Sequence, residues 1–221
     1  MLDKTEFYIN GSWVPSQDGH SFPVLNPATE DAFATITLGG AKDAEAAIAA
    51  AKAAFPAWSM TSPADRAGYL QKLLDVYIAR NDEMGATIST EMGAPIDMAV
   101  SDQAGSGISH LKAFIRALGT MEFQRPLRQG VEGQDIAFEA AGVAALITPW
   151  NWPMNQVVLK VGAALAAGCT MVLKPSEIAP MSSILFAEMI DEVGFPAGVF
   201  NMVNGDGTGV GTILSSHPDI D

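Results

Sequence analysis

The fold is decided by residues 142–211, which read GVAALITPWNWPMNQVVLKVGAALAAGCTMVLKPSEIAPMSSILFAEMIDEVGFPAGVFNMVNGDGTGVG. Three short, nearly uninterrupted apolar runs occur here, over residues 142–148, 169–173 and 199–203. Helical patterns over 154–167 and 180–193 separate them, and another is expected over 208–215. Strands that are apolar on both faces and alternate with helices are typical of a parallel sheet covered by helices. The sequence therefore predicts an α/β fold with right-handed crossovers.

The chain upstream of this repeat is expected to be a small β start followed by helices. Residues 1–40 contain short extended pieces and an Asn10-Gly11 pair, which favours a tight hairpin turn. Ser62 and Pro63 supply a cap and a first-turn proline for one helix. The expected helices cover residues 42–55, 63–80, 82–92 and 97–119.

Residues 122–142 are polar and irregular and predict a two-stranded excursion from the domain. The strand pair could be an ordinary surface hairpin or a surface offered to a neighbouring subunit, and the pattern does not choose between them. The expected division of the chain is 1–121 for the N-terminal strands and helices, 122–142 for the protruding hairpin, and 143–221 for the βα units.

Composition and charge exclude several classes of partner. The 221 residues carry 25 acidic and 12 basic side chains, a net charge of −13, which disfavours nucleic acid and acidic membrane surfaces as partners. The longest apolar stretch, 157–167, is interrupted by Lys160 and is too short to span a membrane. The chain has one cysteine and no signal-peptide pattern at its start, so we expect a reducing compartment and a cytoplasmic protein. Its three histidines lie far apart and predict no metal site.

Ligands of open parallel sheets bind at the carboxyl ends of the strands, so the turns after the three strands are candidate sites. The third turn contains Gly205, Gly207 and Gly211 and opens a helix, an arrangement whose backbone amides could face a diphosphate. Its spacing departs by one residue from the usual dinucleotide pattern. A flexible strand-to-helix turn is the alternative.

The other two turns carry polar side chains that could do chemistry. Lys174 and Glu177 follow the second strand and could bind a ribose, whereas capping of the next helix is the alternative for Glu177. Asn151 follows the first strand and could donate a hydrogen bond to a developing oxyanion, or could cap the helix that Pro153 begins. Cys169 enters its strand at the opposite end and is expected to be a core cysteine.

The chain resembles the N-terminal half of an aldehyde dehydrogenase over its whole length. The segments that carry the resemblance are FYING with Trp13 (7–13), NPAT (26–29), EMGAP (91–95), ITPWNWP (147–153), LKPSE (173–177) and GFPAGVFN (194–201). The resemblance implies a Rossmann-like cofactor domain that is incomplete relative to the family, with a hairpin through which subunits associate.

The resemblance also implies roles for single residues. Asn151 matches a side-chain oxyanion donor, the one catalytic residue expected in this chain. Lys174 and Glu177 match residues that hold the adenine-side ribose. The residues expected at the cofactor are Ile147, Thr148, Pro149, Trp150, Asn151, Lys174, Ser176, Glu177, Gly207 and Gly211.

The function implied is NAD(P)-dependent oxidation of an aldehyde to a carboxylic acid. The catalytic cysteine and the general-base glutamate of such enzymes have no match here, so we expect these residues to be inactive alone. The carboxylate of Glu177 favours NAD, although NADP is possible. The expected partners are an aldehyde and further copies of the chain, as a dimer or tetramer. The alternative is a non-catalytic remnant or fragment that only binds nucleotide or supports assembly. Because the repeat of strands and helices is interrupted, we also expect an uncovered sheet edge after Val203 and Ser215.

Overall fold

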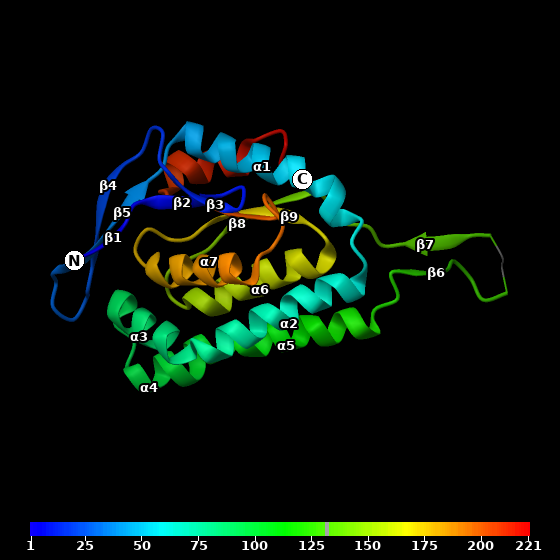
Figure 1. The fold of residues 1–221 in the computed structure, drawn as a ribbon, viewed down its shortest axis with the longest axis horizontal. Helices are drawn as coiled ribbons and strands as arrows, with labels where there is room; N and C mark the ends of the chain where they lie inside the picture. Colours follow the sequence, from blue (N-terminus) through cyan, green and yellow to red (C-terminus); the bar gives the residue numbers. More distant parts are fainter. Residues whose placement is uncertain (131–132) are drawn as a thin grey trace.

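The computed structural model describes residues 1–130 and 133–221 and contains one five-stranded sheet between layers of helices (Figure 1). The strand order is β3-β2-β10-β9-β8. Strands β8, β9 and β10 are parallel, and β2 pairs with β10 in the antiparallel direction. The bounds are β2 Glu6–Ile9, β3 Ser12–Pro15, β8 Val143–Ile147, β9 Thr170–Lys174 and β10 Phe200–Met202. The predicted α/β fold with a parallel sheet is confirmed.

Side chains of the inner strand β9 are buried on both faces of the sheet. Met171 and Leu173 belong to the core on the side of the large helical layer, whereas Val172 packs in a second core on the side of helix α1. This two-sided burial explains why the strand sequence is apolar without alternation.

Helices cover both faces of the sheet (Figure 1). Helix α1 and the short α8 lie on one face, whereas α6 and α7 lie on the other and contact α2. Gly168 and Gly194 end α6 and α7 with φ of 83° and 75°, the left-handed conformation that glycine adopts readily. The bounds are α1 Ala41–Ser59, α6 Pro153–Ala167, α7 Met181–Val193 and α8 Thr212–Ser216.

The helix expected over 42–55 continues to Ser59, past Pro56. Trp58 accounts for the extra turn because it is buried against the rings of Tyr69 and Phe195, with centroid distances of 5.6 and 6.1 Å. The burial of this large ring outweighs the loss of one helical hydrogen bond at the proline.

The helical layer beyond α6 and α7 largely follows the predicted pattern. Ser62 caps its helix through an acceptor bond from the Asp65 amide, and Gly93 ends the next one with φ of 78°. The helix predicted over 97–119 is interrupted by a π-helical segment. The last residue of this segment, Ala104, accepts a hydrogen bond at its carbonyl from the buried hydroxyl of Tyr77, which lies on another helix, at 3.0 Å. The bounds are α2 Pro63–Ala79, α3 Asn81–Met92, α4 Ile96–Met98, η1 Ala99–Ala104 and α5 Gly105–Thr120.

The predicted Asn10-Gly11 hairpin is present and joins β2 to β3. Both residues have positive φ, 53° and 74°, as a tight turn of this kind requires. Because β2 adds to the outer side of β10, the expectation of an uncovered edge after Val203 is wrong. At the other edge of the sheet, the Asp221 amide donates to the Val143 carbonyl at 3.1 Å.

The structure contains a second, smaller sheet, of which the sequence predicted only one strand. It has the order β1-β5-β4, with β1 Leu2–Lys4, β4 His20–Leu25 and β5 Ala32–Leu38. Of these strands, only β5 coincides with an extended piece expected from the sequence, over residues 33–37. The β4 sequence alternates poorly and contains Pro23, which is a weak strand signal.

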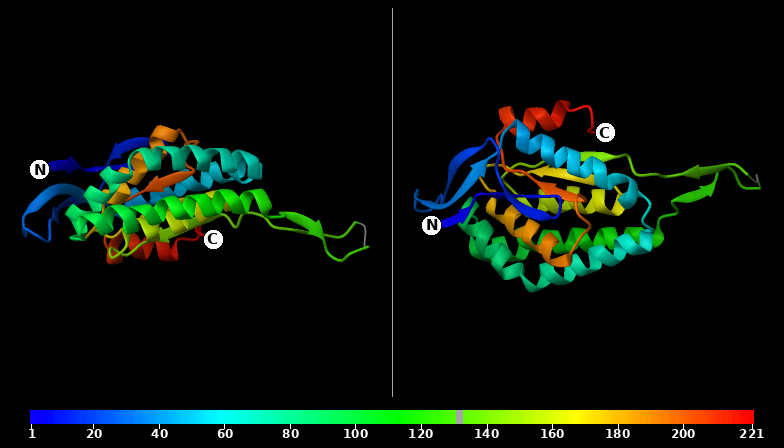
Figure 2. Two further views of the ribbon diagram at one scale, coloured as in Figure 1. Left: turned by 90° about the horizontal axis from the view of Figure 1, so that it is seen from below. Right: turned by 45° about the horizontal axis from the view of Figure 1, so that its top comes forward.

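The excursion predicted over 122–142 is a protruding hairpin that extends away from the helical layers (Figures 1 and 2). Its strands are β6 Gln124–Pro126 and β7 Asp135–Ala137, paired in the antiparallel direction. Most side chains of the two strands are exposed. Residues 131–132 of the excursion lie outside the described residues.

Candidate functional site

The three turns predicted as candidate sites meet at one edge of the main sheet. Because β8, β9 and β10 are parallel neighbours, their carboxyl ends lie side by side. The Thr148 amide donates to the Lys174 carbonyl at 3.2 Å, which joins the first turn to the second. The Lys174 ammonium in turn donates to the Gly205 carbonyl at 2.6 Å, which joins the second turn to the third.

Lys174 is the residue that holds this edge together. Its side chain is buried, and Nζ also donates to the Pro175 carbonyl at 2.8 Å and lies 3.6 Å from Glu177 Oε2. Burial lowers the pKa of Lys174, whereas the charge of Glu177 acts in the opposite direction. Since its donors already bond within the chain, Lys174 is arranged to organise the turns and to position Glu177.

Glu177 is half-buried and lines a mainly apolar cavity of about 510 Å³ together with Trp150 and Ile178. The alternative that it caps the next helix is wrong, because α7 begins only at Met181. Ser176, between Lys174 and Glu177, is buried, and its hydroxyl accepts from the Ile178 amide at 3.3 Å. The Glu177 carboxylate is therefore available to a ligand.

The cap of α7 is Glu91, which sequence reasoning missed as a functional group. Its two carboxylate oxygens accept from the amides of Met181 at 2.6 Å and Ser182 at 3.2 Å. The side chain is fully buried, and this burial raises the pKa of Glu91 to about 7 against the opposing effect of the two amides. No local spacing links Glu91 to a helix 90 positions later, so only the fold brings them together.

The glycine turn leaves space beside Lys174. A Cβ at Gly211 would lie 3.2 Å from the Asp206 carbonyl oxygen and 3.8 Å from Lys174 Cδ, whereas a Cβ at Gly207 would meet nothing within 4 Å. Asp206 orders the turn by accepting from the Gly209 amide at 2.5 Å. The expected helix over 208–215 is instead a π-helical turn, η2 Gly207–Gly211, followed by the single-turn α8. So short a helix offers little dipole for a diphosphate.

The first turn presents apolar and polar side chains to solvent. Ile147 and Trp150 are 40% and 48% exposed although both are large and apolar, and Pro149 and Asn151 are also exposed. The N-cap of α6 is Trp152, with no side-chain cap bond, so the alternative that Asn151 caps this helix is wrong. Thr148 is buried at the base of the turn.

Cys169 lies outside this site. It is buried directly before β9, at the amino end of that strand, whereas the candidate site lies at the carboxyl end. The expectation of a core cysteine is confirmed. Among the described residues no group of histidine, cysteine and carboxylate side chains is arranged to hold a metal ion.

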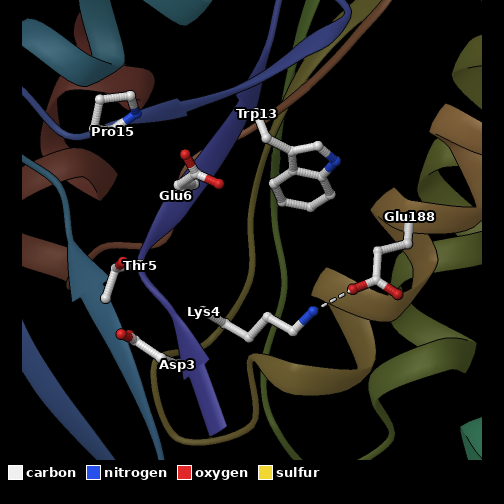
Figure 3. A pocket seen from close by; sticks show the side chains of 7 residues that line it. All are labelled: Asp3, Lys4, Thr5, Glu6, Trp13, Pro15 and Glu188. Atoms are coloured by element: carbon white, nitrogen blue, oxygen red, sulfur yellow. Dashed lines mark hydrogen bonds and ion pairs between the residues drawn. The ribbon is translucent and has the colours of Figure 1, made fainter.

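A second, polar hollow of about 460 Å³ lies at the amino-terminal strands (Figure 3). Trp13, Asp3 and Glu6 line it, and across it the Lys4 ammonium bonds Glu188 of α7 at 2.6 Å. None of the predicted site residues lines this hollow.

Two further results come from comparison with known proteins. The model of the aldehyde dehydrogenase family matches residues 13–221. A 3-succinoylsemialdehyde-pyridine dehydrogenase of a Pseudomonas species is 46% identical over 222 aligned residues, which cover 100% of this chain and 46% of that protein.

In the part of the chain that the structure describes, no helix has the length and apolar character needed to cross a membrane.

Solved structures show the same relationship. An aldehyde dehydrogenase from Bartonella henselae superposes with a TM-score of 0.98 at 55% identity, over 100% of this chain and 46% of that one. Aldehyde dehydrogenase C from Pseudomonas syringae, solved with NAD+ and octanal, gives a TM-score of 0.94 at 46% identity, over 98% of this chain and 44% of that one. The chain thus spans about half the length of these relatives, and it belongs to the aldehyde dehydrogenase family.

Proposed function

We propose that this chain is the cofactor-binding part of an NAD-dependent enzyme that oxidises an aldehyde to a carboxylic acid. The observation that carries the proposal is the linkage of three turns by Lys174 at the carboxyl edge of the sheet. It rests also on family membership, and on the NAD+ bound to the Pseudomonas syringae relative.

The chemistry of the edge fits a dinucleotide. Glu177 supplies acceptors for ribose hydroxyls, and the open side of Gly207 allows a bulky group to approach the backbone. The exposed faces of Ile147 and Trp150 are apolar surfaces that flat rings can cover. Thr148, Pro149, Ser176 and Gly211 complete the proposed cofactor site by shaping the turns.

Glu177 also determines the proposed preference between cofactors. A carboxylate accepts a hydrogen bond from a free 2′-hydroxyl and repels a 2′-phosphate. Lys174 cannot readily offset this repulsion, because its ammonium is buried and bonds two carbonyls. We therefore propose NAD as the cofactor rather than NADP.

Asn151 is the proposed catalytic residue of this chain. Its exposed side-chain amide can donate a hydrogen bond to the aldehyde oxygen as negative charge develops there. When bound, the nicotinamide would accept the hydride that the oxidation removes from the aldehyde. The only thiol here, Cys169, is buried away from Asn151, so residues 1–221 by themselves are proposed not to oxidise aldehydes.

The hairpin of β6 and β7 is proposed to join copies of the protein. It protrudes from the domain and exposes apolar side chains at Leu127 and Phe138. We propose a homo-oligomer on this basis. A cytoplasmic location is proposed because the sequence has a single cysteine, which suits a reducing compartment.

A binding measurement on Glu177 variants tests the cofactor assignment without requiring turnover. Glu177→Gln should weaken NAD binding by about tenfold, because a charged acceptor is lost, and should leave NADP binding unchanged or improved. Glu45→Gln, on the exposed face of α1, is the matched control and should change neither. Wild-type protein that binds NADP much more tightly than NAD would contradict the proposal. Binding of NAD without turnover by the protein as its gene encodes it would favour the non-catalytic alternative.

A further inference from the structure

The turn that carries Glu177 is fixed at its two ends by two buried, ionisable side chains. Lys174 precedes the turn, and its ammonium bonds two carbonyl groups. At the far end, the carboxylate of Glu91 on α3 accepts from the amides of the first two residues of α7. Glu177 lies between these anchors, three positions after Lys174 and four positions before α7 begins at Met181.

Helix α7 has no cap of its own for this first turn. Its N-cap residue is Pro180, which makes no side-chain cap bond, and its first turn contains no acidic residue. Met181 and Ser182 are 5% and 0% exposed, so little water can reach their amides. Amides at the start of a helix have no partner within the helix, and burying them unpaired is unfavourable. The carboxylate of Glu91 therefore holds the start of α7 in place.

The middle of the turn depends on these anchors for its position. Ile178 is 53% exposed, and Glu177 is half-buried in the wall of the cavity of about 510 Å³. Glu91 and Met92 line the same cavity from the side of α3. Because only three residues separate Glu177 from Met181, a displacement of the start of α7 would move the Glu177 carboxylate in this cavity.

We infer that Glu91 is a positioning residue for the cofactor, because by holding the start of α7 it keeps the Glu177 carboxylate where a ribose hydroxyl can bond it. The inference rests on the proposed function. Glu91 acts through Glu177 and not by touching the dinucleotide, since both of its carboxylate oxygens already accept from α7 amides.

A double-mutant cycle on NAD binding tests the inference in the protein as its gene encodes it. Glu91→Ala should weaken NAD binding by up to about tenfold, the loss expected when the Glu177 carboxylate itself is removed. Glu91→Gln keeps one acceptor oxygen and should weaken NAD binding by about threefold. In a Glu177→Gln background, Glu91→Ala should change NAD binding by less than about twofold, because the carboxylate through which it acts is gone.

Turnover of an aldehyde gives a second measurement. Both Glu91 variants should raise KM for NAD and leave kcat within about twofold, because they affect binding of the cofactor and not the reacting groups.

Arg66→Gln is the matched control for a general loss of stability. Arg66 is also a buried charged side chain that bonds two backbone carbonyls. It lies beside Gly168, at the amino end of β9 and so at the opposite end of the sheet from the candidate site. Arg66→Gln should lower the free energy of unfolding and leave NAD binding within about twofold.

The outcomes distinguish the inference from the proposed function. Unchanged NAD affinity in both Glu91 variants, or equal losses from Glu91→Ala in the wild-type and Glu177→Gln backgrounds, would overturn the inference and leave NAD binding standing. No binding of NAD by wild type would overturn both. If Glu91→Ala does not fold, Glu91→Gln completes the same cycle.

Discussion

The turns after β8, β9 and β10 and the hairpin of β6 and β7 are both irregular, polar stretches of sequence, yet the fold uses them in opposite ways. Thr148, Lys174 and Asn204 are almost completely buried in the turns, whereas most side chains of the hairpin strands are exposed. Most buried polar groups are hydrogen-bonded, as Lys174 is, whereas the side-chain amide of Asn204 has no partner among the described residues. The comparison separates the turns, proposed to hold a small molecule, from the hairpin, proposed to contact another copy of the protein.

The largest expected effect is on the pH dependence of the free energy of unfolding, and it concerns Glu91, the buried cap of α7. Its pKa is raised to about 7 in the folded protein, so the folded state favours the neutral carboxyl. Its contribution to stability is complete below pH about 4.5, the unfolded value, and is lost as pH rises through about 7. A shift of this size corresponds to about 3 kcal/mol in the free energy of unfolding.

Glu91→Gln should remove this part of the pH dependence, because the amide does not titrate while its oxygen still accepts from one α7 amide. Urea unfolding of both proteins between pH 4 and 8 measures the difference. Asp82→Asn, which removes an exposed carboxylate from the same helix, α3, is the control variant. Parallel pH profiles for wild type and Glu91→Gln would show that the pKa of Glu91 is the same in the folded and the unfolded protein.

Glu91 also shows where prediction from the sequence fails. The three parallel strands and the helices α6 and α7 were predicted to within about two residues, because apolar strands and glycine-ended helices are local signals, whereas the helix expected over 208–215 was not. The pairing of Glu91 with α7 and of β2 with β10 joins segments far apart in the chain, and no local pattern contains that information. The π-helical segment η1 that precedes α5 is bonded to Tyr77, which lies on another helix.

The candidate site was also predicted only in part, because its turns are local features whereas the bonds between them join distant segments. The turns that contain Lys174, Glu177 and Gly207 follow from the rule that ligands bind at the carboxyl ends of parallel strands. The bonds that fix Lys174 to two carbonyls could not be read from the sequence. Because of these bonds, the role we assign to Lys174 changes from donating to a ribose to holding the turns together.

An intermediate effect is expected for the two glycines of the third turn. Gly211→Ala should lower the free energy of unfolding by about 1 kcal/mol, because the Asp206 carbonyl oxygen must move from 3.2 Å. Gly207→Ala should change stability by less than about 0.5 kcal/mol, because its Cβ would meet nothing within 4 Å. If a dinucleotide approaches this backbone, Gly207→Ala should nevertheless weaken NAD binding. Thermal unfolding and NAD titration of the same samples measure both quantities, and unchanged NAD affinity in Gly207→Ala would remove the turn from the proposed site.

The smallest effect on stability is expected in the hairpin. Leu127 and Phe138 are 47% and 45% exposed, so replacing both by serine removes little buried apolar surface. The free energy of unfolding should change by less than about 0.5 kcal/mol. If copies of the chain associate through this hairpin, the same double variant should shift the protein toward monomer, because exposed apolar side chains of an interface contribute mainly to association.

Sedimentation at several concentrations measures the association, and Met60→Ser is the matched control, since Met60 is 84% exposed on the body of the domain. A loss of association in the hairpin variant alone would place the contact at β6 and β7. Equal association of wild type, the hairpin variant and Met60→Ser would mean that the hairpin is an ordinary surface feature. The comparison with the buried turns would then distinguish a ligand site from a solvated loop, and the assembly surface would have to lie elsewhere on the molecule.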